Sequence, residues 1–382
     1  MISMPKTVAL NASILSAPRT GIGHYVAELA AALQTTHIEL ELFDGWNWRK
    51  EIPSAALPGY SRLSGWVKRF VPNAYSLRRH LQQVRFSQGA ARIRPALYHE
   101  PSLWPFEFDG PMVMTLHDLT HVHYPFTQPK DRLREIERHV SRGLECAQRV
   151  ITDSRFIADE VSRHYGIPAE KLVVAPLGHA PRFHPRSPAQ LAKTLAPLGL
   201  QAGRYLICVG TVEPRKNLQL AIDGYLALPE QVRRHFPLLI AGMPGWGTHQ
   251  LQGSLQRALA SQQIRLLGYQ SDQTLAELLA GARLLLFPSL YEGFGLPVLE
   301  AMASGTPVVL SRRASLPEVA GSAGLYIEPE DAQGCANALY RLIEDETDWQ
   351  ARRTAGLARA QDFTWARCAH ITATTYRELL DH

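Results

Sequence analysis

Short apolar runs alternate with helical patterns along almost the whole chain, and this alternation constrains the fold more than any other feature. Runs such as TVALN, MVMTL and YLICV have the length of buried strands, and amphipathic segments lie between such runs. Strands that alternate with helices form parallel sheets built from βαβ units. The alternation occurs in two series, and 382 residues exceed what one ordinary core needs. We therefore predict an α/β protein with two doubly wound domains.

The segment LGHAPRFHPRSPAQ, rich in proline and arginine, separates the two series. We place the boundary near residue 184, which gives a first domain over 1–183 and a second over 184–364. In open parallel sheets, ligands bind beyond the carboxyl ends of the strands, so the residues that follow each strand are the first candidates for a site. These strand ends are Gly21-Ile22-Gly23, His117-Asp118, Gly210-Thr211, Gly268-Tyr269 and Ser289 to Gly295.

Composition excludes several classes of protein. A hydrophobic content of 46% with 20% charged residues is typical of a soluble globular protein, and no apolar run approaches 18 residues. KTVALNASILSA resembles a weak signal peptide, but Asn11 and Ser13 interrupt it, so we predict a buried first strand. The four cysteines are far apart and show no ligand spacing. They indicate a reducing cytoplasm and argue against a disulfide framework or a zinc site.

Positive charge is concentrated between residues 46 and 94. This stretch holds ten Lys/Arg and one acid, whereas the whole chain has a net charge of only +5. Tryptophan, phenylalanine and tyrosine are interleaved with the bases. Such a segment suits peripheral contact with an anionic membrane or a lipid-linked substrate, on the inner face of the cytoplasmic membrane. A solvated helical face is an equally simple interpretation, and nucleic-acid binding, which we do not expect, is a third.

The segment VGTVEPRKNL indicates an anion site. A strand is predicted to end at Val209-Gly210 and a helix to begin near Asn217, so that Arg215 and Lys216 lie at a helix N-terminus. Free N–H groups and the helix dipole favour anions there, and the two cations add to this preference. We predict that this pair binds a diphosphate, although adjacent bases are more commonly solvated surface charges.

The segment YEGFGLPVLEA places two carboxylates around a tight turn. Glu292 precedes a helix predicted over 296–304, and Glu300 lies about one turn into it. Between them, Gly293 and Gly295 allow backbone N–H groups to approach a phosphate or a sugar closely. A retaining glycosidase would need its two carboxyl groups about 5 Å apart around one bond. The neighbouring diphosphate site favours separate tasks instead, with each carboxylate accepting hydrogen bonds from a different set of sugar hydroxyls.

These motifs resemble the retaining glycosyltransferases of family 4, which have the GT-B fold of two facing Rossmann-like domains with a donor and acceptor cleft between them. EGFGLPVLEA carries the family's pair of glutamates eight residues apart, and GTVEPRKN matches its phosphate motif. The roles that the resemblance implies are diphosphate binding for Arg215, Lys216, Gly295 and Leu296, sugar binding for Glu292, Gly293 and Phe294, ribose binding for Glu300, and contact near the base for Gly268 and Tyr269.

In the N-terminal half, TGIGHY matches the family's first glycine loop, and TLHDLTHVHYP its His-Asp strand end. The resemblance implies that Gly21 and Gly23 approach the donor or acceptor. It also implies that His117 contacts the donor sugar and that Asp118 orients that ring or the acceptor. Together with Glu292 these two are the catalytic candidates. The simpler interpretations are a tight strand-to-helix turn and a hydrogen-bonded pair of loop residues.

On the acceptor side we place His99 and Glu100 of YHEPSLWPF, together with Tyr25, although a loop bounded by prolines explains the same sequence. At the end of the chain, FTWARCAHITATTYRELL resembles the family's last helix, which crosses back to the first domain. This implies that residues 365–382 belong to that domain and that Trp365 is a packing residue.

We expect no metal ion and no other cofactor. His117, Asp118, His121 and His123 have side chains that suit zinc or iron, but family members usually work without a metal. The chain contains no Asp-x-Asp, the motif with which the other large glycosyltransferase fold holds a metal. Arg215 and Lys216 would take over the metal's task of neutralising the diphosphate.

The reaction implied by the resemblance is transfer of a hexose with retained anomeric configuration. The best match is mannose from GDP-mannose, passed to a saccharide or lipid-linked saccharide in bacterial O-antigen or exopolysaccharide assembly. Donors with UDP remain open, as do an epimerase or phosphorylase on the same fold and a non-catalytic nucleotide- or nucleic-acid-binding protein. An NAD dehydrogenase does not fit, because GIGHYV lacks the third glycine of the dinucleotide fingerprint.

Overall fold

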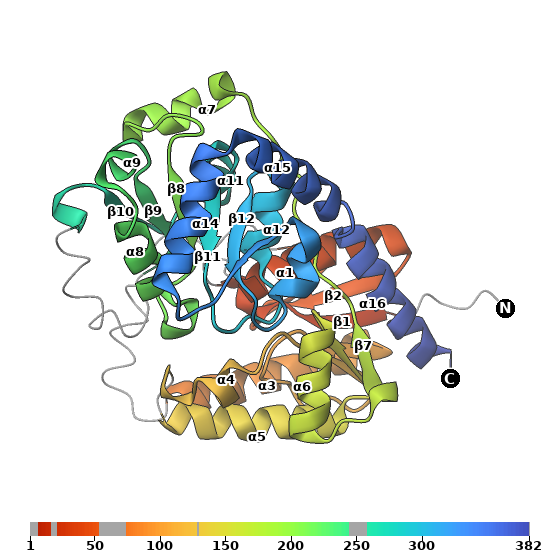
Figure 1. Cartoon of the computed structure of the whole chain (residues 1–382). Helices are drawn as coiled ribbons and strands as arrows, with labels where there is room; N and C mark the ends of the chain where they lie inside the picture. Colours follow the sequence, from red (N-terminus) through yellow and green to blue (C-terminus); the bar gives the residue numbers. More distant parts are fainter. Residues whose placement is uncertain (1–6, 17–20, 53–73, 128–129, 244–257, 382) are drawn as a thin grey trace. The chain divides into compact units, whose positions relative to one another are not determined.

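The protein is described by a computed structural model that covers residues 7–16, 21–52, 74–127, 130–243 and 258–381 (Figure 1). The chain divides into two compact units. The first unit comprises residues 1–119, 130–177 and 365–382, and the second comprises 120–129 and 178–364. The change from the first unit to the second thus falls at Gly178, six residues before the boundary that the proline-rich segment indicates.

The first unit is built on a seven-stranded sheet in the order β3-β2-β1-β4-β5-β6-β7. All neighbours pair in parallel except β3, which is antiparallel to β2. The central strands are buried almost throughout, because helices flank the sheet. The strands are β1 (Thr7–Asn11), β2 (Glu39–Phe43), β3 (Trp48–Arg49), β4 (Leu97–Glu100), β5 (Met112–Leu116), β6 (Arg149–Thr152) and β7 (Leu172–Val174).

The last helix of the chain, α16, belongs to the first unit although it follows the whole of the second unit in sequence. It packs beside α1, and Trp365 is buried at its start with its ring 6.2 Å from that of Tyr25 (Figure 1). The described helices of this unit are α1 (Gly21–Leu33), α3 (Ala74–Ile93), α5 (Lys130–Cys146), α6 (Arg155–Tyr165) and α16 (Trp365–Leu380).

The second unit has a six-stranded, fully parallel sheet in the order β10-β9-β8-β11-β12-β13. Together the two sheets confirm the predicted α/β fold with two doubly wound halves. The strands are β8 (Leu206–Val209), β9 (Leu238–Ala241), β10 (Ile264–Gly268), β11 (Leu284–Phe287), β12 (Val308–Ser311) and β13 (Leu325–Ile327).

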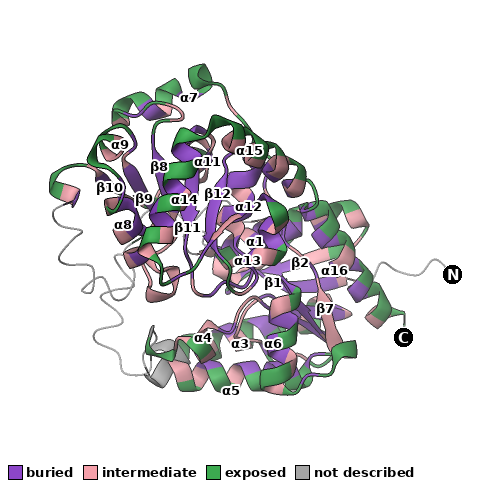
Figure 2. Cartoon of the chain, viewed as in Figure 1, coloured by how far each residue is buried: buried purple, intermediate pink, exposed green. Residues whose placement is uncertain are grey.

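Helices on both faces bury this sheet (Figure 2). On one face α8 and α14 pack against each other and close a core around Tyr225, Leu286 and Leu339. Elsewhere in this unit α7 packs against α11, and α12 against α15. The helices are α4 (Thr120–His123), α7 (Pro188–Leu195), α8 (Leu218–Leu226), α9 (Glu230–His235), α11 (Asp272–Gly281), α12 (Leu296–Ala303), α13 (Leu316–Ala320), α14 (Ala332–Glu344) and α15 (Glu346–Ala360).

Short 3-10 turns connect several of these elements. They are η1 (Ser13–Ser16), η2 (Gln34–Thr36), η3 (Pro125–Thr127), η4 (Ala169–Lys171), η5 (Ala196–Leu198), η6 (Pro214–Lys216) and η8 (Gly321–Ala323). Within the described part of the chain, no helix is both long enough and apolar enough to cross a membrane.

The basic stretch at 46–94 is only partly described, because residues 53–73 lie outside the structure's described ranges. Two of its aromatic residues, one buried and one half-buried, pack into an aromatic cluster of the first unit and are not surface anchors. The Phe86 ring is fully buried and lies 5.3 Å from the ring of Phe43 and 4.9 Å from that of Phe106. Trp48 packs against the same cluster, with its ring 5.2 Å from Phe86. Hydrophobic burial in the first unit therefore accounts for these two aromatics.

Candidate active site

The carboxyl edge of the second sheet brings two glycine-containing strand ends into close contact. Gly210 follows β8 with φ +139°, and Gly242 follows β9. A Cβ atom added at Gly242 would lie 1.9 Å from the carbonyl oxygen of Gly210. Only glycine permits this approach of one backbone to another. No motif in the sequence points to Gly242, although its position directly after an apolar run indicates a strand end.

Arg215 and Lys216 lie in η6, just before α8, close to their predicted place at a helix start. Asn217 adopts the left-handed conformation between the two helices, and its side chain donates to the carbonyl of Pro329 over 2.8 Å. The Leu290 amide donates to the carbonyl oxygen of Arg215 over 2.7 Å. These bonds tie η6 to the neighbouring loops, so the two cations are held by a rigid frame.

The carboxylate of Glu292 lies between the two cations. Arg215 Nη1 donates to Glu292 Oε2 over 2.9 Å, and Lys216 Nζ donates to Oε1 over 2.6 Å. Arg215 also donates from Nε to Glu213 over 3.0 Å. The side chains of Arg215 and Lys216 are each 15% exposed and that of Glu292 is 8% exposed. Both cations are therefore partly neutralised by the protein itself, at a place where water provides little screening.

Burial and charge act against each other on this cluster. Burial lowers the pKa of Lys216, and the nearby Glu292 carboxylate opposes that effect. For Glu292, burial alone would raise the pKa, but Lys216 and Arg215 outweigh it and hold the pKa at about 2. The carboxylate is consequently ionised at neutral pH. An acid with this pKa is unsuited to act as a general acid there.

The turn after Glu292 is shaped by one glycine and one serine. Gly295 has φ +101°, and a Cβ atom at this position would lie 2.7 Å from the side chain of Leu316. Ser315 Oγ donates to the carbonyl oxygens of Glu292 and Phe294 over 2.9 and 3.0 Å. The helix α12 begins directly afterwards at Leu296, close to the predicted bounds. The N–H groups of its first turn form an anion-accepting helix end beside the two cations.

The remaining predicted donor residues follow the same edge. Phe294 is buried, with its ring 5.7 Å from that of Phe363, so its side chain is part of the core and only its backbone can contact a ligand. Glu300 lies one turn into α12 and is half-buried. Gly268 ends β10 with φ +66°, and Tyr269 beyond it is 52% exposed. An exposed aromatic ring at this place can stack on a flat base.

In the first unit, His117 forms a buried pair with a residue that the sequence analysis did not single out. His117 Nδ1 lies 2.7 Å from Asp153 Oδ2, and Nε2 lies 3.1 Å from the carbonyl oxygen of Pro101. An ionised Asp153 and the carbonyl of Pro101 both accept hydrogen bonds, so this geometry fits a ring with a proton on each nitrogen. Burial would lower the pKa of His117, but Asp153 outweighs it and raises the pKa. The position of Asp153 at the end of the predicted strand in RVITDS could have identified it as a candidate site residue.

Asp118 is half-buried beside this pair, and its charge helps to raise the pKa of both His117 and Asp153. Within the described residues, no three His, Cys, Asp or Glu side chains converge as metal ligands would. The glycines of the predicted loop lie inside the first turn of α1. Gly21 is exposed and Gly23 is buried, while residues 17–20 before them lie outside the described ranges.

The acceptor-side prediction for His99, Glu100 and Tyr25 is at odds with the structure. All three side chains are fully buried and bonded within the first unit. His99 bonds Tyr376 through Nδ1 over 2.5 Å and Thr115 through Nε2 over 2.7 Å, and burial lowers its pKa to about 3.

The other two side chains have their own internal partners. Glu100 accepts from Asn11 over 2.8 Å and from Ser102 over 2.6 Å, and burial raises its pKa. The Tyr25 hydroxyl bonds Thr115 over 2.9 Å. These three polar side chains thus form hydrogen bonds in the interior of the first unit and do not point to a ligand.

Solved structures of other proteins have the same fold. The chain is similar to sucrose-phosphate synthase from Thermosynechococcus elongatus, with 22% identity and a TM-score of 0.75 over 98% of this chain and 99% of the other. It is also similar to HepE of Anabaena, solved with UDP and glucose, with 19% identity and a TM-score of 0.73 over 98% of this chain and 100% of the other. Two parallel α/β units of this kind define the GT-B class of glycosyltransferases.

Comparison of the sequence leads from this class to a family. The family model "Glycosyl transferases group 1" matches residues 197–359, and "Glycosyltransferase Family 4" matches residues 19–182. The O-antigen chain mannosyltransferase B of Escherichia coli is 35% identical over 374 residues, which are 95% of this chain and 97% of the relative. The chain therefore belongs to the family 4 glycosyltransferases, and it is an enzyme that transfers a glycosyl group.

Proposed function

We propose that the protein transfers mannose from GDP-mannose to a saccharide or lipid-linked saccharide, with retained anomeric configuration, in the assembly of a bacterial surface polysaccharide. The full-length similarity to an O-antigen mannosyltransferase supports the sugar and the pathway class. The observation that carries the proposal is the pair of buried cations, Arg215 and Lys216, at the carboxyl edge of the second sheet beside the N-terminus of α12.

In this proposal the donor diphosphate binds Arg215 and Lys216 and shares them with Glu292. Negative charge develops on the diphosphate as the sugar leaves, and the two cations and the α12 N–H groups stabilise that charge. Because these groups are already held in place by η6 and by Ser315, little reorganisation is needed during the reaction. The departing phosphate oxygen takes the proton of the acceptor hydroxyl on the same face of the sugar.

Glu292 has a double task in this arrangement. It keeps the two cations together before the donor arrives, and its carboxylate then accepts a hydrogen bond from a hydroxyl of the transferred sugar. In the first unit, Asp153 holds the His117 ring in position, and His117 is kept as a proposed sugar contact; its Nε2 must leave the carbonyl oxygen of Pro101 before it can donate to a hydroxyl. Glu300 accepts from the ribose hydroxyls, and Tyr269 stacks on the base.

The test is a thermal-shift series with GDP, UDP, ADP and their common sugars, each with and without EDTA. A ligand at about 100 times its Kd stabilises by about 2.7 kcal/mol, which is a shift of several degrees. We expect selective stabilisation by GDP and GDP-mannose that EDTA does not change. Stabilisation by UDP and UDP-sugars alone would mean that the donor is a UDP-sugar and not GDP-mannose. Stabilisation by no nucleotide would refute the proposed donor site. The variant in which Arg215 and Lys216 are both alanine is the matched negative control.

We further propose that α3 places the enzyme on an anionic membrane surface. Leu77, Leu81 and Val84 follow one another by four and three residues and are all exposed, with exposed Arg78 and Arg85 beside them. An apolar stripe bordered by bases suits the interface of anionic lipids.

Sedimentation with vesicles that contain phosphatidylglycerol tests this. Leu81→Asp should abolish binding, whereas Leu266→Asp, which changes an equally exposed leucine of the second unit, should not. Equal binding by the Leu81 variant and the wild type would contradict the membrane proposal.

A further inference from the structure

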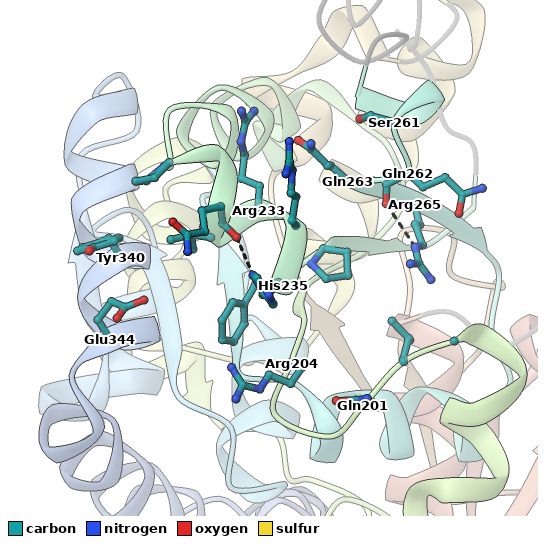
Figure 3. A pocket seen from close by; sticks show the side chains of 18 residues that line it. Gln201, Arg204, Arg233, His235, Ser261, Gln262, Gln263, Arg265, Tyr340 and Glu344 are labelled. Carbon is teal, nitrogen blue, oxygen red and sulfur yellow. Dashed lines mark hydrogen bonds between the residues drawn. The ribbon is translucent and has the colours of Figure 1, made fainter.

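The second unit contains a large pocket (Figure 3). It lies at the edge of the sheet opposite the candidate active site. It is lined by 199–201 and Arg204 before β8, by Pro229 and 231–237 before β9, by 261–263 and Arg265 around the start of β10, and by Tyr340 and Glu344 of α14. Since β8, β9 and β10 are parallel neighbours, their amino ends lie at one edge. The volume of about 1080 Å³ is at the upper end for small-molecule sites.

The pocket is strongly basic. Arg204, Arg233, Arg234 and Arg265 line it, whereas Glu344 is the only carboxylate among those described residues that line it. Arg234 pairs with Glu230 over 2.6 Å. Among the described residues, no carboxylate forms an ion pair with any of the other three arginines. Arg233 also acts on the nearby Glu230 without forming an ion pair with it, so most but not all of this charge is available to a ligand.

Local structure holds these arginines in place. Arg265 donates from Nη1 to the carbonyl of Leu198 over 2.7 Å and from Nε to that of Gln262 over 3.4 Å, which leaves Nη2 outside both bonds. The guanidinium of Arg204 lies over the ring of Phe236 at 5.4 Å. The Nε of Arg233 is buried and has no hydrogen-bond partner among the described residues. A guanidinium fixed in this way loses little entropy when it binds an anion.

The C-terminal end of α9 explains the presence of only two of the four pocket arginines. Arg233 and Arg234 lie in the last turn of α9, where cations interact well with the helix dipole. Arg204 and Arg265 come from two other segments, so no single helix end accounts for them. Amide groups from Gln201 and Gln263 also line the pocket and can bind hydroxyl groups.

We propose that this pocket is a second binding site, for a ligand that carries phosphate groups. Planar guanidinium groups bind phosphate oxygens in pairs, and several of them around one hollow suit a ligand with more than one negative charge. The phosphate belongs either to a soluble molecule, such as a sugar phosphate, or to the headgroup of a lipid. The site is separate from the donor site and does not depend on the proposed function.

The experiment is calorimetric titration of the full chain with pyrophosphate and with mannose 6-phosphate, followed by sedimentation with vesicles that contain phosphatidylglycerol. Arg204→Gln should weaken binding about tenfold, because it removes a charged donor from the phosphate. The double variant Arg233→Gln and Arg265→Gln should weaken it further. Lys216→Gln, which changes the candidate active site, should keep this binding event.

A matched control removes two exposed arginines of the first unit, Arg138 and Arg142, and so gives the same change in net charge as the double variant. It should bind like the wild type.

Two results support the site. If the soluble phosphates bind and the binding depends on Arg204, the ligand is a soluble molecule. If only vesicles bind and that binding depends on Arg204, the ligand is a lipid headgroup. The proposal is overturned if no probe binds, or if Arg204→Gln binds as the wild type does. Among the described residues, the Arg204 side chain has a ring contact with Phe236 but no hydrogen bond, so Arg204→Gln remains informative should the double variant fail to fold.

Discussion

The most informative perturbation of this enzyme is Glu292→Gln. It removes the negative charge from between Arg215 and Lys216 while keeping the size of the side chain. The carboxyl pKa of 4.5 falls to about 2 in the folded protein. This difference corresponds to about 3 kcal/mol of stability, since each tenfold change in an acid constant is worth about 1.4 kcal/mol. For a unit of this size we expect the Tm to fall by about 6–12 °C.

The loss of stability depends on pH. A group with a lowered folded pKa stabilises the protein fully above its ordinary value, here 4.5, and this stabilisation disappears as the pH falls toward about 2. The difference in unfolding free energy between wild type and Glu292→Gln should therefore be constant near neutral pH and shrink under acid conditions. Urea unfolding at pH 7, 4 and 3 measures it. Glu213→Gln is the matched control, because Glu213 bonds the same Arg215 but is more exposed, and its replacement should cost well under about 1 kcal/mol.

Ligand binding should change in the opposite direction. Without the carboxylate, both cations are available to the donor diphosphate, so GDP should bind about tenfold more tightly while glycosyl transfer is lost. Calorimetry with GDP and a transfer assay with GDP-mannose measure the two effects. Glu300→Gln should instead weaken the binding of GDP. Weaker binding of GDP by Glu292→Gln, or a Tm equal to that of the wild type, would refute the reasoning that one carboxylate is shared between two cations.

Three further predictions follow from close contacts and buried charges. Asp153→Asn should lower the pKa of His117, because it removes the largest effect that opposes burial and leaves only Asp118 and the carbonyl of Pro101 to oppose it; NMR titration of the ring measures this, and an unchanged pKa would contradict the pair. Gly242→Ala should destabilise by about 2–3 kcal/mol in urea unfolding, since its Cβ would overlap a backbone oxygen, whereas Gly21→Ala, with open space around its Cβ, should not destabilise. Gly295→Ala should lower the rate of glycosyl transfer by a larger factor than the equilibrium constant of folding, because a side chain strains the left-handed turn before α12 and so distorts the proposed donor site. Equal factors for the two quantities would count against a role of Gly295 in the donor turn.

Local patterns in the sequence predicted the two parallel sheets, the start and end of α12, and the place of Arg215 and Lys216 beside a helix start. These features depend on residues that are near one another in the chain. Strand length, helical periodicity and the preferences of proline and glycine are all expressed within a few residues. The same motifs were sufficient to indicate the family to which the chain belongs.

Tertiary structure alone decided which of these residues touch. Glu292 is 76 residues from Lys216, yet its carboxylate bonds that side chain and Arg215 rather than standing apart from them. Asp153 meets His117 across neighbouring strands, whereas His99, expected at an acceptor, bonds Tyr376 from the last helix in the interior.

The basic pocket is another case, because its arginines come from three separate segments, before β8, before β9 and at the start of β10. The physical reason is common to all of these contacts. The charge and hydrogen-bond partners of a polar side chain are set by strand order and burial, and a sequence pattern states neither of them.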